Sequence, residues 1–203
     1  MNRIDLYANV TGCPLMCSDI IRDGSTNIPR GFYTRAQVGD PIDLMVVAIN
    51  PGQPMESEIG IYSGMSAENQ AATCLEFARA AFEPPYGKTF FKRLAKWLSY
   101  VLGVGEEAVF ESVVYTNAVK CTTQNNKKPV WETALTCYRH HLSKEIEVWK
   151  PRLIIALGNS SSEYLEALGI SFEFLPHPSH REHADYHVPF CDALRSKLRD
   201  CVQ

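Results

Sequence analysis

Four short, mostly apolar runs, each ended by a polar or turn-forming residue, constrain the fold of this chain more than any other feature. They occupy residues 43–49, 110–117, 152–157 and 172–175. The first run is apolar without alternation, which is typical of a strand buried on both faces. Between the runs lie segments with helical spacing, such as Phe90, Leu94, Trp97 and Val101. Strands that alternate with helices favour right-handed crossovers. We therefore predict an α/β protein, a three-layer α/β/α sandwich around a four-stranded, mainly parallel central sheet.

The length of the chain, and a sequence without linkers, repeats or low-complexity tracts, predict a single domain over residues 1–203. Residues 1–40 carry scattered glycine, proline and arginine, and we expect an irregular N-terminal segment there. The expected helices cover residues 66–82, 89–101, 130–149, 159–168 and 190–201. Ser66 can cap the first of them, and Pro84-Pro85 follows its end.

The composition excludes several classes of protein. The values of 45% hydrophobic and 21% charged residues are typical of a soluble globular protein, and a net charge of −3 gives no argument for a protein that coats nucleic acid. A local basic face could still bind a phosphate backbone. No apolar run reaches membrane-spanning length, and the N-terminus lacks the apolar core of a signal peptide. Seven cysteines, an odd number, favour a reducing compartment. We expect a cytoplasmic monomer without membrane contacts.

Polar side chains stand at the carboxyl ends of the expected strands. Asn50 follows the first strand, Asn117 ends the second, and His177 follows the fourth. In open α/β sheets these ends form one edge, where ligands bind. Each residue also has a structural interpretation, because Asn50 before Pro51 is a good turn former and the other two can satisfy loop backbone groups. Their expected gathering at one edge favours a functional site.

Four motifs in this order, VVAINPG, TNAVKC, IIALGNSSSEYL and HPSH, resemble those of the uracil-DNA glycosylase superfamily. The resemblance runs from about Ile42 to His180, which is most of the chain. Its Asn-Pro-Gly step is similar to the mismatch-specific and single-strand-selective branches, whereas TNAVKC and PRLIIALG are similar to the iron–sulfur branch. Each motif alone is weak, but four in order at expected strand ends are specific.

The resemblance implies roles for these residues in cleaving an N-glycosidic bond. Asn50 would hold the attacking water, at a place where other branches have an aspartate. His177 would stabilise the charge that develops on the pyrimidine O2. Asn117 would recognise the edge of uracil through its amide. The further positions that the resemblance places next to the base are Ile49, Gly52 and Ser179.

An aromatic ring is expected to stack on the base. Tyr86, in PPYG ahead of a helix, resembles the Pro-Phe-Gly step of the family, and Tyr62 is the alternative. Taken alone, either tyrosine is more typical of core packing. The passage between Gln53 and Pro84 is longer than in the family and could cover the pocket, enlarge the interface or block duplex DNA.

Four cysteines form a second set of candidate site residues. Three residues separate Cys13 from Cys17, and fifteen separate Cys121 from Cys137. The set resembles that of the iron–sulfur glycosylases, which implies a 4Fe–4S cluster on four thiolates, although the first spacing is one residue longer than in the family. Zinc and four ordinary buried thiols are the alternatives. The cysteines expected to be packing residues are Cys74, Cys191 and Cys201.

Contacts with DNA are expected from a few basic residues. The loop after His177 offers His180 and Arg181, without the apolar wedge that is typical of the family. Lys120, in TNAVK, is a further candidate for DNA contact. The other lysines that could contact phosphates, or could be solvated surface charges, are Lys88, Lys127 and Lys128.

These features together predict a monofunctional DNA glycosylase that removes uracil or another deaminated base from DNA. Two other functions remain open. A protein of this fold could bind damaged DNA without cutting it, which Asn50 in place of aspartate and the missing wedge favour. An enzyme acting on free nucleosides or nucleotides is favoured by the acidic charge balance. The sequence does not distinguish uracil from hypoxanthine or xanthine, nor single-stranded from duplex DNA.

Overall fold

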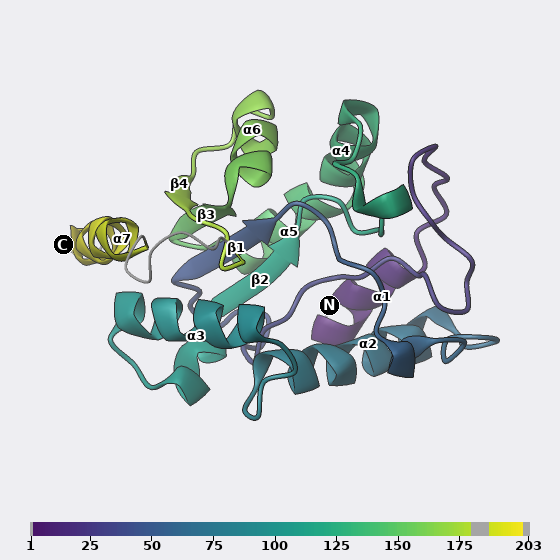
Figure 1. Cartoon of the computed structure of the whole chain (residues 1–203), viewed down its shortest axis with the longest axis horizontal. Helices are drawn as coiled ribbons and strands as arrows, with labels where there is room; N and C mark the ends of the chain where they lie inside the picture. The colour runs from purple at the N-terminus through teal and green to yellow at the C-terminus, as the bar shows by residue number, and fades with distance from the viewer. Residues whose placement is uncertain (1, 180–186, 201–203) are drawn as a thin grey trace.

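A four-stranded parallel sheet forms the centre of the protein in a computed structural model, which describes residues 2–179 and 187–200 (Figure 1). The strands are β1 (Leu44–Ala48), β2 (Val113–Asn117), β3 (Leu153–Leu157) and β4 (Glu173–Leu175). Their order across the sheet is β2-β1-β3-β4, and every neighbouring pair is parallel. The predicted parallel sheet is confirmed.

The register of the sheet aligns the carboxyl ends of its strands. Ala48 pairs with Asn117, and Leu157 pairs with Leu175. Beyond the first pair, the backbone N–H of Ala118 donates to the carbonyl of Ala48 at 2.8 Å. The segments that follow the four strands therefore start from one edge of the sheet, as the ligand-binding crevice of an open α/β fold requires.

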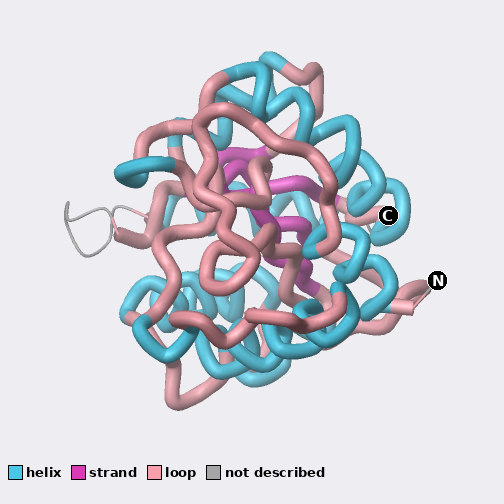
Figure 2. Tube along the Cα trace, turned by 90° about the vertical axis from the view of Figure 1, so that its right-hand side faces the viewer, coloured by secondary structure: helices cyan, strands magenta, loops and turns pink. Residues whose placement is uncertain are grey.

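Helices cover both faces of the sheet (Figure 1, Figure 2). They are α1 (Arg3–Thr11), α2 (Ala67–Phe82), α3 (Thr89–Leu102), α4 (Trp131–Cys137), α5 (Ser143–Trp149), α6 (Asn159–Ala167) and α7 (Val188–Asp200). Met45 and Val47 of β1 pack into one core with side chains of α1, α5 and α6. Leu44 and Val46 pack into a second core with α3 and α7. The three-layer α/β/α sandwich is confirmed, since strands that are apolar on both sides need helices on each face.

The expected helices agree with the structure to within a few residues. The Ser66 side chain caps α2 by accepting a hydrogen bond from the backbone N–H of Asn69 at 3.3 Å. The helix expected over residues 130–149 is divided into α4, a π-helical turn η4 (Tyr138–Leu142) and α5. Short 3-10 turns cover Glu56–Glu58 (η1), Glu106–Glu111 (η2) and Gln124–Asn126 (η3). Among the described helices, none combines the length and the apolar character needed to cross a membrane.

The prediction of an irregular segment over residues 1–40 is wrong at its start, where α1 forms. Asn2 and Asp5 make a capping box, in which Asn2 Oδ1 accepts from the Asp5 backbone and Asp5 Oδ2 accepts from the Asn2 backbone. The helix then buries Leu6, Tyr7 and Val10. Because this apolar stripe is short and flanked by polar residues, the sequence pattern alone did not reveal it.

The rest of the N-terminal segment is irregular but closely packed against the sheet. Tyr33 forms an isolated antiparallel bridge with Tyr115 of β2, and the two residues exchange backbone hydrogen bonds of 2.7 and 2.8 Å. The N–H of Arg30 donates to the carbonyl of Lys120 at 2.7 Å. Residues 30–33 therefore form a wall beside the carboxyl end of β2.

Candidate active site at the carboxyl edge of the sheet

A cavity of about 350 Å³ lies at the carboxyl edge of the sheet. The sequence-predicted site residues that line it are Ile49, Asn50, Gly52, Asn117 and His177. The other walls come from residues 30–33, residues 53–58, the second half of α2 and the start of α3. Residues distant in sequence are therefore brought together at the edge where the strand pattern placed them.

Asn117 presents an unsatisfied group to this cavity. It is the last residue of β2 and only 6% exposed. Its Oδ1 is buried without a hydrogen-bond partner among the described residues, and the side chain lines the cavity. An unpaired buried acceptor costs about 1–3 kcal/mol, so the fold alone does not explain this amide. A ligand with an N–H group in the cavity would satisfy it.

Asn50 is held in place through its amide nitrogen. Nδ2 donates to the carbonyl of Pro51 and to Oγ1 of Thr123, each at 3.2 Å. The Thr123 hydroxyl in turn donates to the carbonyl of Lys127. The loop that follows β2 thus fixes the orientation of a side chain that follows β1. A fixed amide at a cavity wall can orient a water molecule by hydrogen bonding, although it cannot act as a strong base.

His177 is positioned by three different segments. Its ring lies 5.1 Å from that of Phe90, centroid to centroid. The backbone N–H of Ser179 donates to Nδ1 at 3.3 Å, so a neutral ring carries its proton on Nε2, where it can be donated. Gly158 has φ +82°, and a Cβ there would lie 3.1 Å from Cβ of His177. Glycine at position 158 therefore allows both the turn after β3 and the close approach of His177.

Aromatic side chains make up much of the cavity wall. Phe90 and Phe91 at the start of α3 line it together with Phe82, Tyr33 and Tyr115. Tyr33 stacks on Phe82 with ring centroids 4.8 Å apart and planes at 12°. The ring centroid of Phe82 also lies 4.7 Å from that of Tyr115. A flat ligand entering the cavity would meet aromatic faces and edges, which favour stacking.

Both tyrosines predicted to stack on the base are found elsewhere. Tyr86 does not line the cavity, because its hydroxyl donates to Oε2 of Glu106 at 2.8 Å and turns the ring toward η2. Tyr62 is fully buried, and its hydroxyl donates to Oε1 of Glu58 at 3.0 Å. The structure therefore does not bring the ring of Tyr86 or of Tyr62 to the cavity. Phe90 lies beside the site instead, but its position in an apolar helical stripe suggested only core packing.

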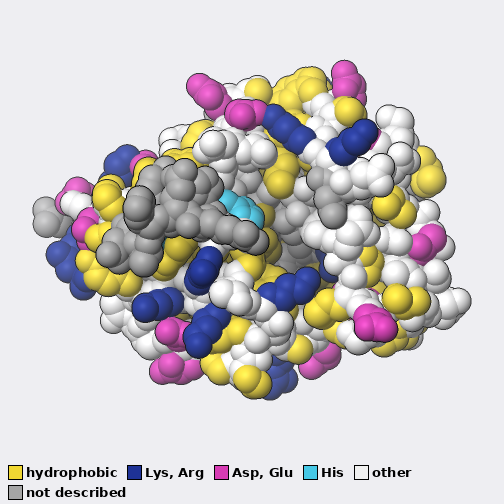
Figure 3. All heavy atoms as spheres, viewed as in Figure 1, with side chains coloured by type: hydrophobic (Ala, Val, Ile, Leu, Met, Phe, Trp, Pro, Cys, Tyr) yellow, Lys and Arg dark blue, Asp and Glu magenta, His cyan; other side chains and the backbone are white. Residues whose placement is uncertain are grey.

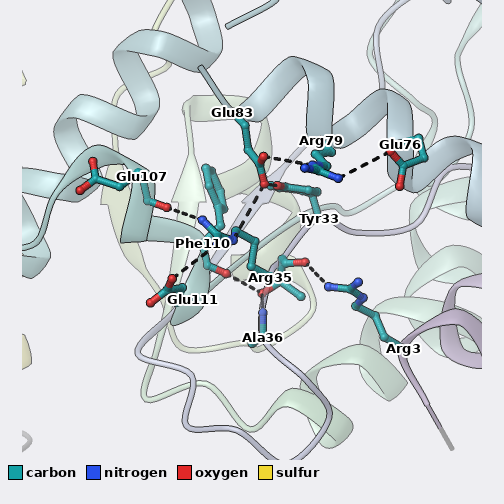
Figure 4. Close-up of polar contacts among 11 residues, drawn as sticks. Arg3, Tyr33, Arg35, Ala36, Glu76, Arg79, Glu83, Glu107, Phe110 and Glu111 are labelled. Carbon is teal, nitrogen blue, oxygen red and sulfur yellow. Dashed lines mark hydrogen bonds and ion pairs between the residues drawn. The ribbon is translucent and has the colours of Figure 1, made fainter. Parts of the chain in front are cut away.

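A polar network behind the aromatic wall holds Tyr33 in place (Figure 4). The Tyr33 hydroxyl donates to Oε1 of Glu83 at 2.7 Å. Nε of Arg79 donates to the other carboxylate oxygen of Glu83 at 3.2 Å. Arg35 lies between Glu83 and Glu111, with N–O distances of 4.0 and 3.6 Å. The orientation of this wall residue therefore depends on charges outside the cavity.

A partly buried ion pair forms another part of the cavity wall. Arg30 Nη2 lies 2.9 Å from Oε1 of Glu58, which is only 2% exposed. Glu58 Oε2 accepts from the backbone N–H of Met55 at 2.7 Å. The long passage after Gln53 therefore contributes to the cavity, which is one of the roles considered from the sequence. Arg30 and Glu58 were missed because neither follows a strand.

Lys120 does not lie on a DNA-accessible surface, so the prediction that it contacts DNA is wrong. Its side chain is buried, with Nζ 2.7 Å from Oε2 of Glu145 and 2.6 Å from Oγ1 of Thr116. The carboxylate and the hydroxyl draw the ammonium group into the interior between β2 and α5.

The other predicted contact residues have different positions. Ser179, which was expected next to the base, is exposed and does not line the cavity, while its backbone N–H donates to His177. Lys88 lines the cavity. Lys127 and Lys128 are exposed, and Lys128 forms an ion pair with Glu163. The two residues that lie outside the described part of the chain are His180 and Arg181.

The four cysteines singled out in the sequence converge on a second, small cavity. Its lining includes Cys13, Cys17, Cys121 and Cys137, which come from the segment after α1, the loop after β2 and the end of α4. All four are free thiols. Among the described residues, however, no group of three or more His, Cys, Asp or Glu side chains is arranged as a ready metal site.

The chemistry of these thiols fits metal ligation. Burial raises the pKa of the Cys121 thiol to about 12 and that of Cys137 to about 11. Arg22 near Cys121 and Lys120 near Cys137 offset this effect only in part, so both thiols stay protonated at neutral pH, whereas a bound metal ion would stabilise the thiolates. Cys191 is buried elsewhere, as expected for a packing residue, whereas Cys74 is buried and also lines the cavity at the sheet edge. Cys201 lies outside the described residues.

Comparisons with known proteins agree with this geometry. The profile of the uracil DNA glycosylase superfamily matches residues 37–197. A Type-4 uracil-DNA glycosylase of Saccharolobus solfataricus is 38% identical over 74 residues, 36% of this chain and 32% of the relative. A Type-4 uracil-DNA glycosylase of Sulfurisphaera tokodaii is 32% identical over 74 residues, 36% of this chain and 31% of the relative. The chain thus spans about a third of the length of these curated relatives.

Proposed function

Because this chain belongs to the uracil DNA glycosylase superfamily, we propose that it is a DNA glycosylase that removes uracil, or another deaminated base, by hydrolysing the N-glycosidic bond. The observation that carries the proposal is the meeting of Asn50, Asn117 and His177 at one cavity. The volume of about 350 Å³ and the aromatic walls with a few convergent polar groups are typical of small-molecule sites.

Recognition of the base is the role of Asn117. A base turned out of the stack would enter the cavity and stack on its aromatic wall, which includes Phe90 and Phe91. Uracil carries a hydrogen on N3 that the unpaired Oδ1 of Asn117 can accept, and its O4 can accept from the amide nitrogen. Cytosine has an acceptor at N3 and would leave Oδ1 unpaired. A site built in this way therefore discriminates against the normal base.

Hydrolysis of the bond uses Asn50 and His177. A water held by Asn50 attacks C1′ of the sugar, and the base departs with the electron pair of the C1′–N bond. The Nε2–H of His177 donates a hydrogen bond to the pyrimidine O2, where negative charge gathers. The hydroxyl of the water remains on C1′, and its proton ends on the released base. Because an amide is a poor base, leaving-group stabilisation by His177 carries more of the rate.

A base-release assay tests the proposed function. Oligonucleotides with a single uracil, hypoxanthine or xanthine are incubated with the protein, in single strands and in duplexes, beside free deoxyuridine. We expect release of uracil from at least one oligonucleotide, an alkali-sensitive abasic site at that position, and no reaction of free deoxyuridine. Tight binding to these oligonucleotides without base release would identify a damage-binding protein instead. Reaction of deoxyuridine alone would identify a nucleoside hydrolase.

We also propose that Cys13, Cys17, Cys121 and Cys137 hold a 4Fe–4S cluster. The support is their convergence on one cavity from three separate segments, together with a donor set of four thiols. The residues would join the N-terminal segment to the end of β2 and to α4. Since none of the four lines the larger cavity, we assign the group a structural role and no step of the hydrolysis.

Replacing Cys121 with serine should remove iron from the protein. Anaerobically purified wild-type protein is expected to be brown and to contain iron and sulfide in equal amounts, whereas Cys121→Ser should lose most of both and unfold at a lower temperature. The matched control is Cys191→Ser, because Cys191 is also a buried cysteine but lies on α7 away from this set. Colourless wild-type protein without iron, or equal iron loss in both variants, would exclude the cluster at these residues.

A further inference from the structure

We propose that an exposed basic face of α3 binds the phosphate backbone of the DNA strand that carries the target base. This α3 basic face consists of Lys88, Lys92, Arg93 and Lys96, all of which are exposed. The inference rests on the proposed function and adds the surface that holds the strand. Three of its four residues were not among the DNA-contact candidates from the sequence.

The charges of the α3 basic face work against the stability of its own helix. Lys88, Lys92 and Lys96 are four residues apart and lie along one side, where like charges destabilise a helix by about 0.2–0.5 kcal/mol per pair. Lys88 is the N-cap residue and Lys92 follows the first turn, so these two lysines lie near the positive end of the helix dipole. By contrast, α2 and α4 carry Glu68 and Glu132 in their first turns. No acidic residue occurs in α3.

Among the described residues, the α3 basic face has no acidic partner in an ion pair, unlike several other cations on the surface. Lys128 pairs with Glu163, and Lys197 pairs with Glu173. No ion pair between described residues includes a member of the α3 basic face. A row of cations that no described carboxylate neutralises and that its helix does not favour suits an anionic partner.

The α3 basic face begins at the proposed active site. Lys88 lines the cavity, and Nη1 of Arg93 donates to the carbonyl of Pro178 at 3.0 Å, next to His177. From Lys88 to Lys96 the helix axis advances by about 12 Å, and one strand of DNA advances by about 3.4 Å per nucleotide. The face therefore spans roughly three to four nucleotides. In Figure 3, Lys and Arg side chains gather where Figure 1 draws α3.

The salt dependence of DNA binding tests this surface. Dissociation constants of the wild-type protein and of Lys92→Gln/Lys96→Gln are measured between 50 and 200 mM salt, on single-stranded and duplex oligonucleotides with and without uracil. Each lost phosphate contact should lower the slope of log affinity against log salt by about 0.9 on duplex DNA or about 0.7 on single strands. For two contacts, the wild-type protein should lose about 12-fold or about 7-fold more affinity than the variant over this range.

The control is Lys144→Gln/Lys150→Gln, which removes two exposed lysines at and after α5. We expect this control variant to keep both the wild-type slope and the wild-type rate of base release at saturating DNA. Equal slopes in all three proteins, or equal losses in both double variants, would overturn the proposal. If the wild-type protein released no base but the slope were still lowered only in Lys92→Gln/Lys96→Gln, the glycosylase activity would be refuted. The proposed DNA-binding surface would still be supported.

Discussion

His177→Ala is expected to slow base release by about 10²- to 10³-fold, the usual cost of removing one donor that stabilises a developing negative charge. The ring is fixed between Phe90, Gly158 and the backbone N–H of Ser179, which leaves the proton of a neutral ring on Nε2. Because Asn50 has no carboxylate to activate the water, loss of this donor removes much of the remaining catalysis. The measurement is the single-turnover rate of uracil release, with the protein in saturating excess over a uracil-containing oligonucleotide.

Two further variants separate the chemistry of His177 from its packing. His140→Ala removes an exposed histidine of η4 outside the cavity and should leave the rate unchanged. Gly158→Ala keeps the imidazole but adds a Cβ 3.1 Å from that of His177, at a backbone φ of +82° that alanine rarely adopts. We expect this variant to be slower as well. Wild-type rates in His177→Ala would show that leaving-group stabilisation comes from another residue.

Lys120→Met should lower the free energy of unfolding by about 3–5 kcal/mol, the cost of removing one partner from a buried ion pair. Glu145 is fully buried, and its Oε2 accepts from both Lys120 and Thr116 while Oε1 has no partner among the described residues. Without the ammonium group, the carboxylate would retain a single hydroxyl donor. Denaturant unfolding measures the change, which is a large part of the stability of a typical domain.

The same chain supplies a control for this prediction. Lys128 and Glu163 form an exposed pair, with 46% and 59% of the side chains accessible, so Lys128→Met should cost only about 0–1 kcal/mol. The double variant Lys120→Met/Glu145→Leu should recover part of the loss, because no uncompensated charge remains buried. Iron content is measured in parallel, since Lys120 precedes Cys121. Similar losses in Lys120→Met and Lys128→Met would contradict the structural role of the buried pair.

The sequence was sufficient to predict the layers of the fold and the edge that carries the site. Strands that are buried on both faces appear in the sequence as continuous apolar runs. The register of the parallel sheet then aligns the carboxyl ends of these strands, as the pairing of Ala48 with Asn117 shows. Asn50, Asn117 and His177 could be found in this way because each stands at the end of such a run. The four cysteines that line the small second cavity were found through the resemblance to the iron–sulfur glycosylases.

Other features were decided only by tertiary contacts. From the sequence alone Lys120 is expected at the surface, because lysine is usually exposed. In the structure it is buried, because its ammonium group pairs with Glu145, 25 residues later in the chain. Tyr86 is turned away from the cavity by Glu106, and Phe90 takes the place next to His177. The direction of a side chain depends on partners that lie far along the chain. Local patterns encode which segments are buried, whereas the partner of each polar or aromatic group is set only when those segments pack.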